Sequence, residues 1–395
     1  MFERRITLFR ILGFEVRIDI SWVILAILVT WTLAAGLFPA WYPDLPANTY
    51  WWMGIVGALG LFFSIIFHEF SHAIVARRYG LPITGITLFI FGGVAEMDEE
   101  PASPKVEFLM AVAGPVASVI LAAVFFGIYA GAAAWSQPVG GILAYLAVIN
   151  LLLAVFNLIP AFPLDGGRML RAALWAWKGK LRWATRVASN IGSGFGLLLI
   201  FLGIFNVVTG NFIGGFWWFL IGLFVRAAAG NSYQQVVVRQ ALEGVPVRRL
   251  MHRDPITVPP DLSVSELVEN FFYRHYHKMF PVVEGGRPIG CVTSKQVKDL
   301  PRERWPYATV ADILQRSSAE NTVRPDADAL DAMALMNRSR NSRLLVVEGD
   351  RLAGIVTLKD MLSFLSLKLA FEEDEDIGLH GADSLSGDLP SERAR

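Results

Sequence analysis

Long apolar runs separated by short polar segments make up most of the first 230 residues. Six runs are long enough to cross a hydrocarbon core of about 30 Å as helices; they cover residues 19–39, 50–76, 107–134, 140–162, 190–209 and 212–229. The first exceeds the apolar length of about 7 to 15 residues that is typical of a signal peptide. The pattern therefore predicts an α-helical polytopic membrane protein with six transmembrane helices.

Basic residues gather in alternate connections between these runs. Lys and Arg are present in segments 4–17, 77–78 and 168–186, and they are missing from segments 39–50 and 133–141. Because positive loops stay on the cytoplasmic side, we expect a multi-pass protein of the cell membrane with both termini in the cytoplasm.

The segment 81–105 differs from the helical runs. Alternating and β-branched residues, followed by Gly92 and Gly93, favour a membrane-associated β-hairpin, with a plain cytoplasmic hairpin as the alternative. An unpaired strand edge at this place could bind an unwound substrate by strand addition. This makes Gly92 and Gly93 candidate substrate-binding residues.

Charge and cysteine content narrow the function classes. The 35 basic and 35 acidic residues balance, and no basic patch with interleaved aromatic residues stands outside the membrane-flanking loops, so nucleic acid is not an expected partner. The single cysteine, Cys291, excludes an internal disulfide. Neither nucleic-acid binding nor an internal disulfide is therefore expected.

The second apolar run contains the ionisable motif His68-Glu69-Phe70-Ser71-His72. Histidines four residues apart lie on one helix face, where both rings can bind a single zinc ion, one per chain. Glu69 lies about 100° around the helix, where it can take a proton from a water at the metal. A pair of core histidines is the alternative, although ionisable groups inside a membrane usually serve a function.

A catalytic zinc site needs a third protein ligand, and Asp165 is well placed to supply it. The second and fourth runs cross the membrane in the same direction, so Asp165 is expected at the depth of the histidines, behind Pro160 and Pro163. An ordinary turn at a helix exit with Asp165 as its cap explains the segment equally well. Asn157, two turns before Asp165 on the same predicted helix, could hydrogen-bond a substrate backbone or simply pack.

Four segments together resemble the site-2 protease family of intramembrane zinc metalloproteases. They are HEFSH at 68–72, FGGVAEM at 91–97, AGPVAS at 113–118 and NLIPAFPLDGGR at 157–168. The resemblance implies that His68, His72 and Asp165 bind zinc, that Glu69 is the general base and that Asn157 contacts substrate. In the third segment we expect Gly114, Pro115 and Ser118 to serve helix packing, with a direct role in binding as the alternative.

The last third contains two copies of one pattern, at 246–302 and 308–368. These copies resemble a pair of CBS domains, an α/β fold that commonly binds adenosine nucleotides and dimerises. The resemblance implies one nucleotide site, at Thr357 and Asp360, because Gln296 replaces the acid in the first copy. His275 and His277 are expected at a solvated helix exit, with a second metal site as the alternative.

These features predict four regions: a membrane domain at 1–230, a linker at 231–245, a cytoplasmic CBS pair at 246–370 and an acidic disordered tail at 371–395. The leading hypothesis is a protease that cleaves within or near a transmembrane segment of another membrane protein. Nucleotide binding would modulate it, and the CBS pair would support a homodimer. A channel or transporter gated by the CBS pair and a catalytically inactive scaffold are the alternatives.

Overall fold

The computed structural model describes residues 5–11, 13–81, 83–89, 92–97, 100–132 and 136–382. The chain forms two compact units, Met1–Val236 and Val237–Arg395. Each unit is considered by itself.

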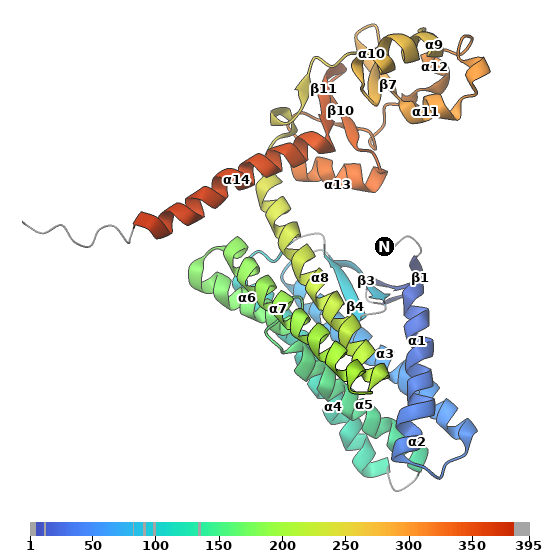
Figure 1. Ribbon diagram of the computed structural model, residues 1–395, viewed down its shortest axis with the longest axis vertical. Coiled ribbons are helices and arrows are strands. Elements are labelled where there is room, and N and C mark those ends of the chain that lie inside the picture. The colour runs from blue at the N-terminus through green and yellow to red at the C-terminus, as the bar shows by residue number, and fades with distance from the viewer. Residues whose placement is uncertain are drawn as a thin grey trace, which may run out of the picture. The chain divides into compact units, whose positions relative to one another are not determined.

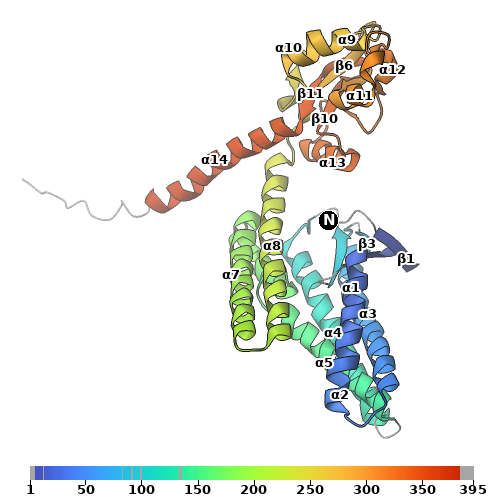
Figure 2. The ribbon, with the colours of Figure 1, turned by 45° about the vertical axis from the view of Figure 1, so that its right-hand side comes forward.

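Helices make up most of the first unit (Figures 1 and 2). In chain order they are α1 (Ile20–Thr32), a π-helical turn (Leu33–Leu37), α2 (Phe38–Trp41), α3 (Ala47–Arg78), α4 (Pro104–Ala132), α5 (Gln137–Asn157), α6 (Asp165–Lys178), α7 (Leu181–Val208) and α8 (Phe212–Leu242). The first helix begins where the Asp19 carboxylate accepts a hydrogen bond from Ser21 N at 2.9 Å, which satisfies one of the free backbone donors of the first turn.

Five helical segments of the described chain are long and apolar enough to cross a membrane: Ile20–Trp41, Ala47–Arg78, Pro104–Gly131, Gln137–Asn157 and Leu181–Val208. The sixth predicted span, 212–229, lies in α8 but is not among them, so the number of six remains a prediction. The fourth span is shorter than predicted. It ends at Asn157, shortly before Pro160 and Pro163, two residues that lack the backbone N–H of a helical hydrogen bond and so favour a break here.

A four-stranded sheet lies at the end of the bundle where α1 begins (Figures 1 and 2). Its strands are β1 (Arg5–Ile11), β2 (Phe14–Asp19), β3 (Ile83–Phe89) and β4 (Gly92–Met97), in the order β1-β2-β3-β4. Strands β2 and β3 run parallel, and the two outer pairs are antiparallel. We predicted strands only in the segment 81–105, which contains β3 and β4, and we treated residues 1–18 as the basic flank of a helix.

The first hairpin packs against the helix that bears the histidines. Phe14, Val16 and Ile18 point inward from β2 and are buried. The Phe14 ring makes an edge contact with Phe70 of α3, and the Arg77 guanidinium lies 4.3 Å from the centre of the Phe14 ring. Alternation over residues 14–18 was the available sequence signal for this strand.

The second unit contains two sheets. Strands β6 (Met279–Glu284), β7 (Arg287–Thr293) and β8 (Gln315–Arg316) form one, and β5 (His252–Arg253), β11 (Arg351–Thr357), β10 (Arg343–Glu348) and β9 (Thr322–Val323) form the other. The short first strand of each repeat pairs with the sheet of the other repeat. Met279, Cys291 and Leu345 join the two sheets in one buried cluster.

Helices cover these sheets. In the first repeat they are α9 (Val264–Glu266) with the π-helical Leu267–Phe272 and α10 (Tyr273–His275), then α11 (Ser294–Asp299), and the second repeat begins with α12 (Val310–Ile313). Short 3₁₀ turns stand at Val247–Arg249 and Arg302–Arg304, and the second repeat has α13 (Ala329–Ser339) and α14 (Leu358–Ala382).

Burial raises the pKa of the Cys291 thiol to about 11, so the nucleophilic thiolate is scarce at neutral pH.

Helices extend into two segments that we predicted as a linker and as a disordered tail. Helix α8 continues to Leu242 through most of the predicted linker 231–245, and α14 continues to Ala382 through part of the tail that we expected to be disordered. Leu, Lys, Ala and Glu are strong helix formers, which explains the continuation past residue 370. Residues 383–395 of that tail lie outside the described residues.

Candidate metal centre

Helix α3 positions the two histidines of the HExxH motif. Their spacing of four residues puts both rings on one face of the helix. Both side chains are buried, with 4% of His68 and 5% of His72 exposed, and their ring centres are 4.9 Å apart. The outer face of the same helix is apolar and exposed, as expected for a helix in lipid.

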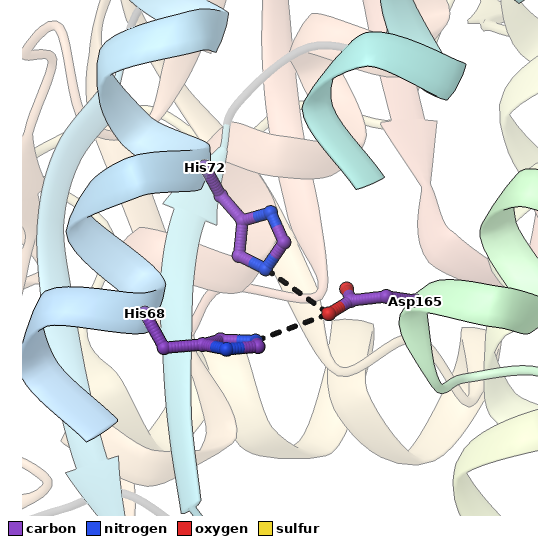
Figure 3. Close-up of side chains that lie close together, drawn as sticks. All are labelled: His68, His72 and Asp165. Atoms are coloured by element: carbon purple, nitrogen blue, oxygen red, sulfur yellow. Dashed lines mark hydrogen bonds and ion pairs between the residues drawn. The ribbon is translucent and has the colours of Figure 1, made fainter. Parts of the chain in front are cut away.

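Asp165 meets these histidines from the opposite side. It is the first residue of α6, and Figure 3 shows both rings pointing toward its carboxylate. Asp165 Oδ2 lies 3.0 Å from Nε2 of His68 and 3.3 Å from Nε2 of His72. One donor atom from each of the three residues falls within 4.8 Å of the others, and no other such group of three occurs in the described part of the chain.

Glycines bring Asp165 to this position. After α5 ends, residues 158–164 form an irregular loop, and α6 packs directly on the loop backbone. A Cβ on Gly166 would lie 2.3 Å from Leu158 O, and one on Gly167 would lie 2.2 Å from Phe162 N. On α7, a Cβ on Gly192 would lie 1.9 Å from Phe162 O. Since such contacts are forbidden to any larger residue, the glycines allow the close approach that places the carboxylate.

The remaining ring nitrogens of both histidines bind groups on α4. His72 Nδ1 lies 2.6 Å from the Met110 carbonyl oxygen, which can only accept, so Nδ1 donates and Nε2 is the ring nitrogen left to bind a metal. His68 Nδ1 lies 2.9 Å from Ser118 Oγ. Such outer contacts orient metal-binding histidines. Neither contact was predicted from the sequence, in which a carbonyl partner leaves no signal.

Gly114 stands in front of the two ligand nitrogens. A Cβ at this position would lie 2.3 Å from Nε2 of His72 and 2.5 Å from Nε2 of His68. The sequence favoured a packing role for this glycine, with a direct role in binding as the alternative. The structure shows that its missing side chain leaves open the space beside both Nε2 atoms.

This donor set fits zinc. Two neutral imidazole nitrogens and one carboxylate are a ligand set of catalytic zinc sites, which keep a fourth position for water or substrate. The Nδ1 partners direct both Nε2 atoms inward, and Gly114 leaves room between them. The three side chains could therefore hold one zinc ion.

The other predicted site residues of this unit are not among the three converging groups. Glu69 follows His68 on α3 and is partly exposed. Asn157 and Asp165, which we placed on one helix, belong to separate helices, and Asn157 Nδ2 donates to Leu153 O of its own helix at 2.9 Å. Gly92 and Gly93 lie in edge strand β4, opposite Phe89 and Leu88.

In the second unit, Thr357 and Asp360 form a helix cap. Asp360 Oδ2 accepts hydrogen bonds from Thr357 N at 3.0 Å and Thr357 Oγ1 at 2.6 Å, while Oδ1 lies 2.9 Å from His252 Nε2. Thr293 and Gln296 form the corresponding capping box at the start of α11. In each repeat, these two positions therefore cap the helix that follows the last strand.

His275 and His277 contact aromatic neighbours. Their ring centres lie 6.4 Å and 5.8 Å from that of Phe280. Neither belongs to a group of three candidate ligands within the described residues. The arrangement supports a helix exit packed on an aromatic ring.

Comparison with known proteins identifies the family. The model of peptidase family M50 matches residues 56–140 and 126–203, and the CBS domain model matches residues 247–303 and 310–367. A protein of Mycobacterium tuberculosis named "Putative zinc metalloprotease Rip3" is 36% identical over 368 residues, covering 92% of this chain and 93% of its own. The chain belongs to peptidase family M50.

Two further similarities come from Methanocaldococcus jannaschii. Zinc metalloprotease MJ0392 is 31% identical over 377 residues, covering 94% of this chain and 99% of its own. The solved structure of a site-2 protease from this organism is 31% identical, covers 58% of this chain and 94% of the solved one, and has a TM-score of 0.42.

Membership in the family confirms the predicted resemblance to site-2 proteases with CBS domains. The protein is a zinc metallopeptidase of the site-2 type and a multi-pass membrane protein. The interpretation as an enzyme therefore replaces the alternatives of a channel or transporter and of an inactive scaffold.

Proposed function

We propose that this peptidase hydrolyses a peptide bond within or near a transmembrane segment of another membrane protein. His68, His72 and Asp165 would hold one zinc ion, and Glu69 would be the general base. The observation that carries the proposal is the convergence of three buried donor groups, two of which lie on α3, a helix long and apolar enough to cross the membrane. Ionisable groups in such a helix are costly unless they serve a function.

Zinc, when bound, supplies a Lewis acid that polarises the scissile carbonyl and acidifies water. The protein residues provide the rest. His68 and His72 present Nε2, because Ser118 and Met110 engage Nδ1. Glu69 takes a proton from the attacking water and returns it to the departing amine nitrogen, so no net proton is consumed.

Substrate binding would use the elements beside this centre. We propose that the free edge of β4, with Gly92 and Gly93, pairs with an unwound substrate strand, and that Asn157 hydrogen-bonds its backbone. The position of β4 at the edge of the sheet supports the first part, since an edge strand has unpaired backbone groups. By the positive-inside rule, both termini would be cytoplasmic.

Comparison of membrane proteomes tests this function. Cells that produce the Glu69→Gln protein should accumulate an intact membrane precursor that cells with the wild-type protein convert to fragments. The fragment ends should map to or beside a transmembrane segment of that precursor. Identical proteomes, or cleavage confined to soluble regions, would contradict the proposed substrate class.

We also propose that the CBS pair binds one adenosine nucleotide near Thr357 and Asp360 and supports a homodimer. In titrations of the full-length protein with ATP and AMP, Asp360→Asn should weaken binding at least about tenfold, because an amide is a poorer acceptor for ribose hydroxyls than a carboxylate. Gln296→Ala, at the matching place of the first repeat, should bind normally. Equal affinities of both variants would contradict this site.

A further inference from the structure

A buried ion pair joins the helix that provides Asp165 to the helix that supports the histidines. Arg171 on α6 and Glu107 on α4 are 3% and 0% exposed. Arg171 Nε donates to Glu107 Oε1 at 2.5 Å, and Nη2 contacts the same oxygen. A second, half-exposed carboxylate, Glu100, lies 3.3 Å from Nη2. The proposed chemistry uses none of these groups.

On α4, Glu107 belongs to the face that serves the metal centre. Met110, Gly114 and Ser118 follow it at three, seven and eleven residues, which is the spacing of one helical stripe. These three residues bind His72, leave the space before both Nε2 atoms and bind His68. A shift of α4 at Glu107 would therefore move every outer contact of the histidines.

On α6, Arg171 supports the loop that leads to Asp165. Its guanidinium carbon lies 5.1 Å from the centre of the Phe162 ring, and Phe162 also meets Gly167 and Gly192 through its backbone. The planar guanidinium can stack on a ring and bind a carboxylate at the same time, which a lysine cannot do. One side chain thus holds both the loop and α4.

We propose that Arg171 and Glu107 are positioning residues of the zinc centre: their ion pair sets the separation between Asp165 and the two histidines. This inference rests on the proposed ligand set. A buried ion pair adds little stability compared with apolar residues of similar volume. Its directional contacts are what an apolar pair cannot reproduce, and metal geometry tolerates errors of only a few tenths of an ångström.

Zinc affinity of the full-length protein in detergent tests the inference, with no need for a peptidase assay. After chelation, zinc is titrated against a chromophoric chelator, and the unfolding temperature is measured without zinc. The double variant Glu107→Leu/Arg171→Met should raise the zinc Kd about 10- to 100-fold, with an unfolding temperature close to that of the wild type. Arg171→Lys keeps the positive charge but lacks the planar guanidinium, so it should give a smaller rise in the zinc Kd.

Thr185→Val is the control. Thr185 is fully buried on α7 and donates to Leu181 O of its own helix, so its loss should affect stability alone. A double variant with wild-type zinc affinity would overturn the inference. If that variant does not fold, unchanged affinity in Arg171→Lys would overturn it. Normal zinc binding by Asp165→Asn would instead refute the ligand set.

Discussion

Gly114→Ala is expected to abolish stoichiometric zinc binding and, with it, proteolysis. The new methyl carbon would lie 2.3 Å and 2.5 Å from the two ligand nitrogens, well inside contact distance. The rings cannot retreat freely, because Ser118 and the Met110 carbonyl hold their far sides. Since the methyl takes the space where both lone pairs point, zinc affinity should fall by about 100-fold or more, beyond the usual effect of an outer contact.

The same helix offers a matched control. Gly127 of α4 has no atom within 4 Å of the place where its Cβ would stand. Gly127→Ala should therefore contain one zinc ion per chain and cleave like the wild type, and it should gain helix propensity. Elemental analysis of both purified proteins measures the difference. A zinc-replete, active Gly114→Ala protein would show that the metal does not lie between the histidines and α4.

Glu69→Gln is expected to keep zinc and to lose turnover. Glutamine has almost the shape of glutamate but cannot accept the proton of the attacking water at neutral pH. Because Glu69 is no part of the proposed ligand set, metal content should stay at one ion per chain. General-base catalysis typically contributes about 10²- to 10⁴-fold, so kcat toward the precursor found by proteomics should fall by that factor.

Asp165→Asn, tested in the same assay, separates the role of a metal ligand from that of the general base. It removes a ligand charge next to His68 and His72, so it should lose both zinc and activity. Turnover by Glu69→Gln at the wild-type rate would remove Glu69 from the mechanism. Zinc loss in that variant would mean that Glu69 belongs to the ligand set.

The local features of the membrane half were predictable from the sequence. Residues 50–76 were expected to form a helix with His68 and His72 on one face, and α3 runs from Ala47 to Arg78. Helix periodicity and the fixed rise per residue make such features a property of neighbouring residues alone. The paired motifs also sufficed for the family, which the comparisons confirm.

Other features were not predictable because they depend on residues far apart in the chain. The hairpin of β1 and β2 is stabilised by Phe70 and Arg77, more than 50 residues later, and the basic residues of this segment suggested only a membrane flank. Ser118 and Gly114 looked like ordinary packing residues. Nothing adjacent in sequence shows that both face the histidine rings.

The amino-acid sequence alone determined the apolar spans, the two histidines on one helix face, the paired repeats and the family. Each depends on local periodicity or on motifs a few residues long. Only the tertiary structure decided that the Asp165 carboxylate meets the His68 imidazole across 97 residues of chain, together with that of His72. It also decided that Gly114 keeps the space between the two rings, and that Arg171 and Glu107 bind the supporting helices together. Those contacts arise from the packing of separate helices, which residue spacing does not encode.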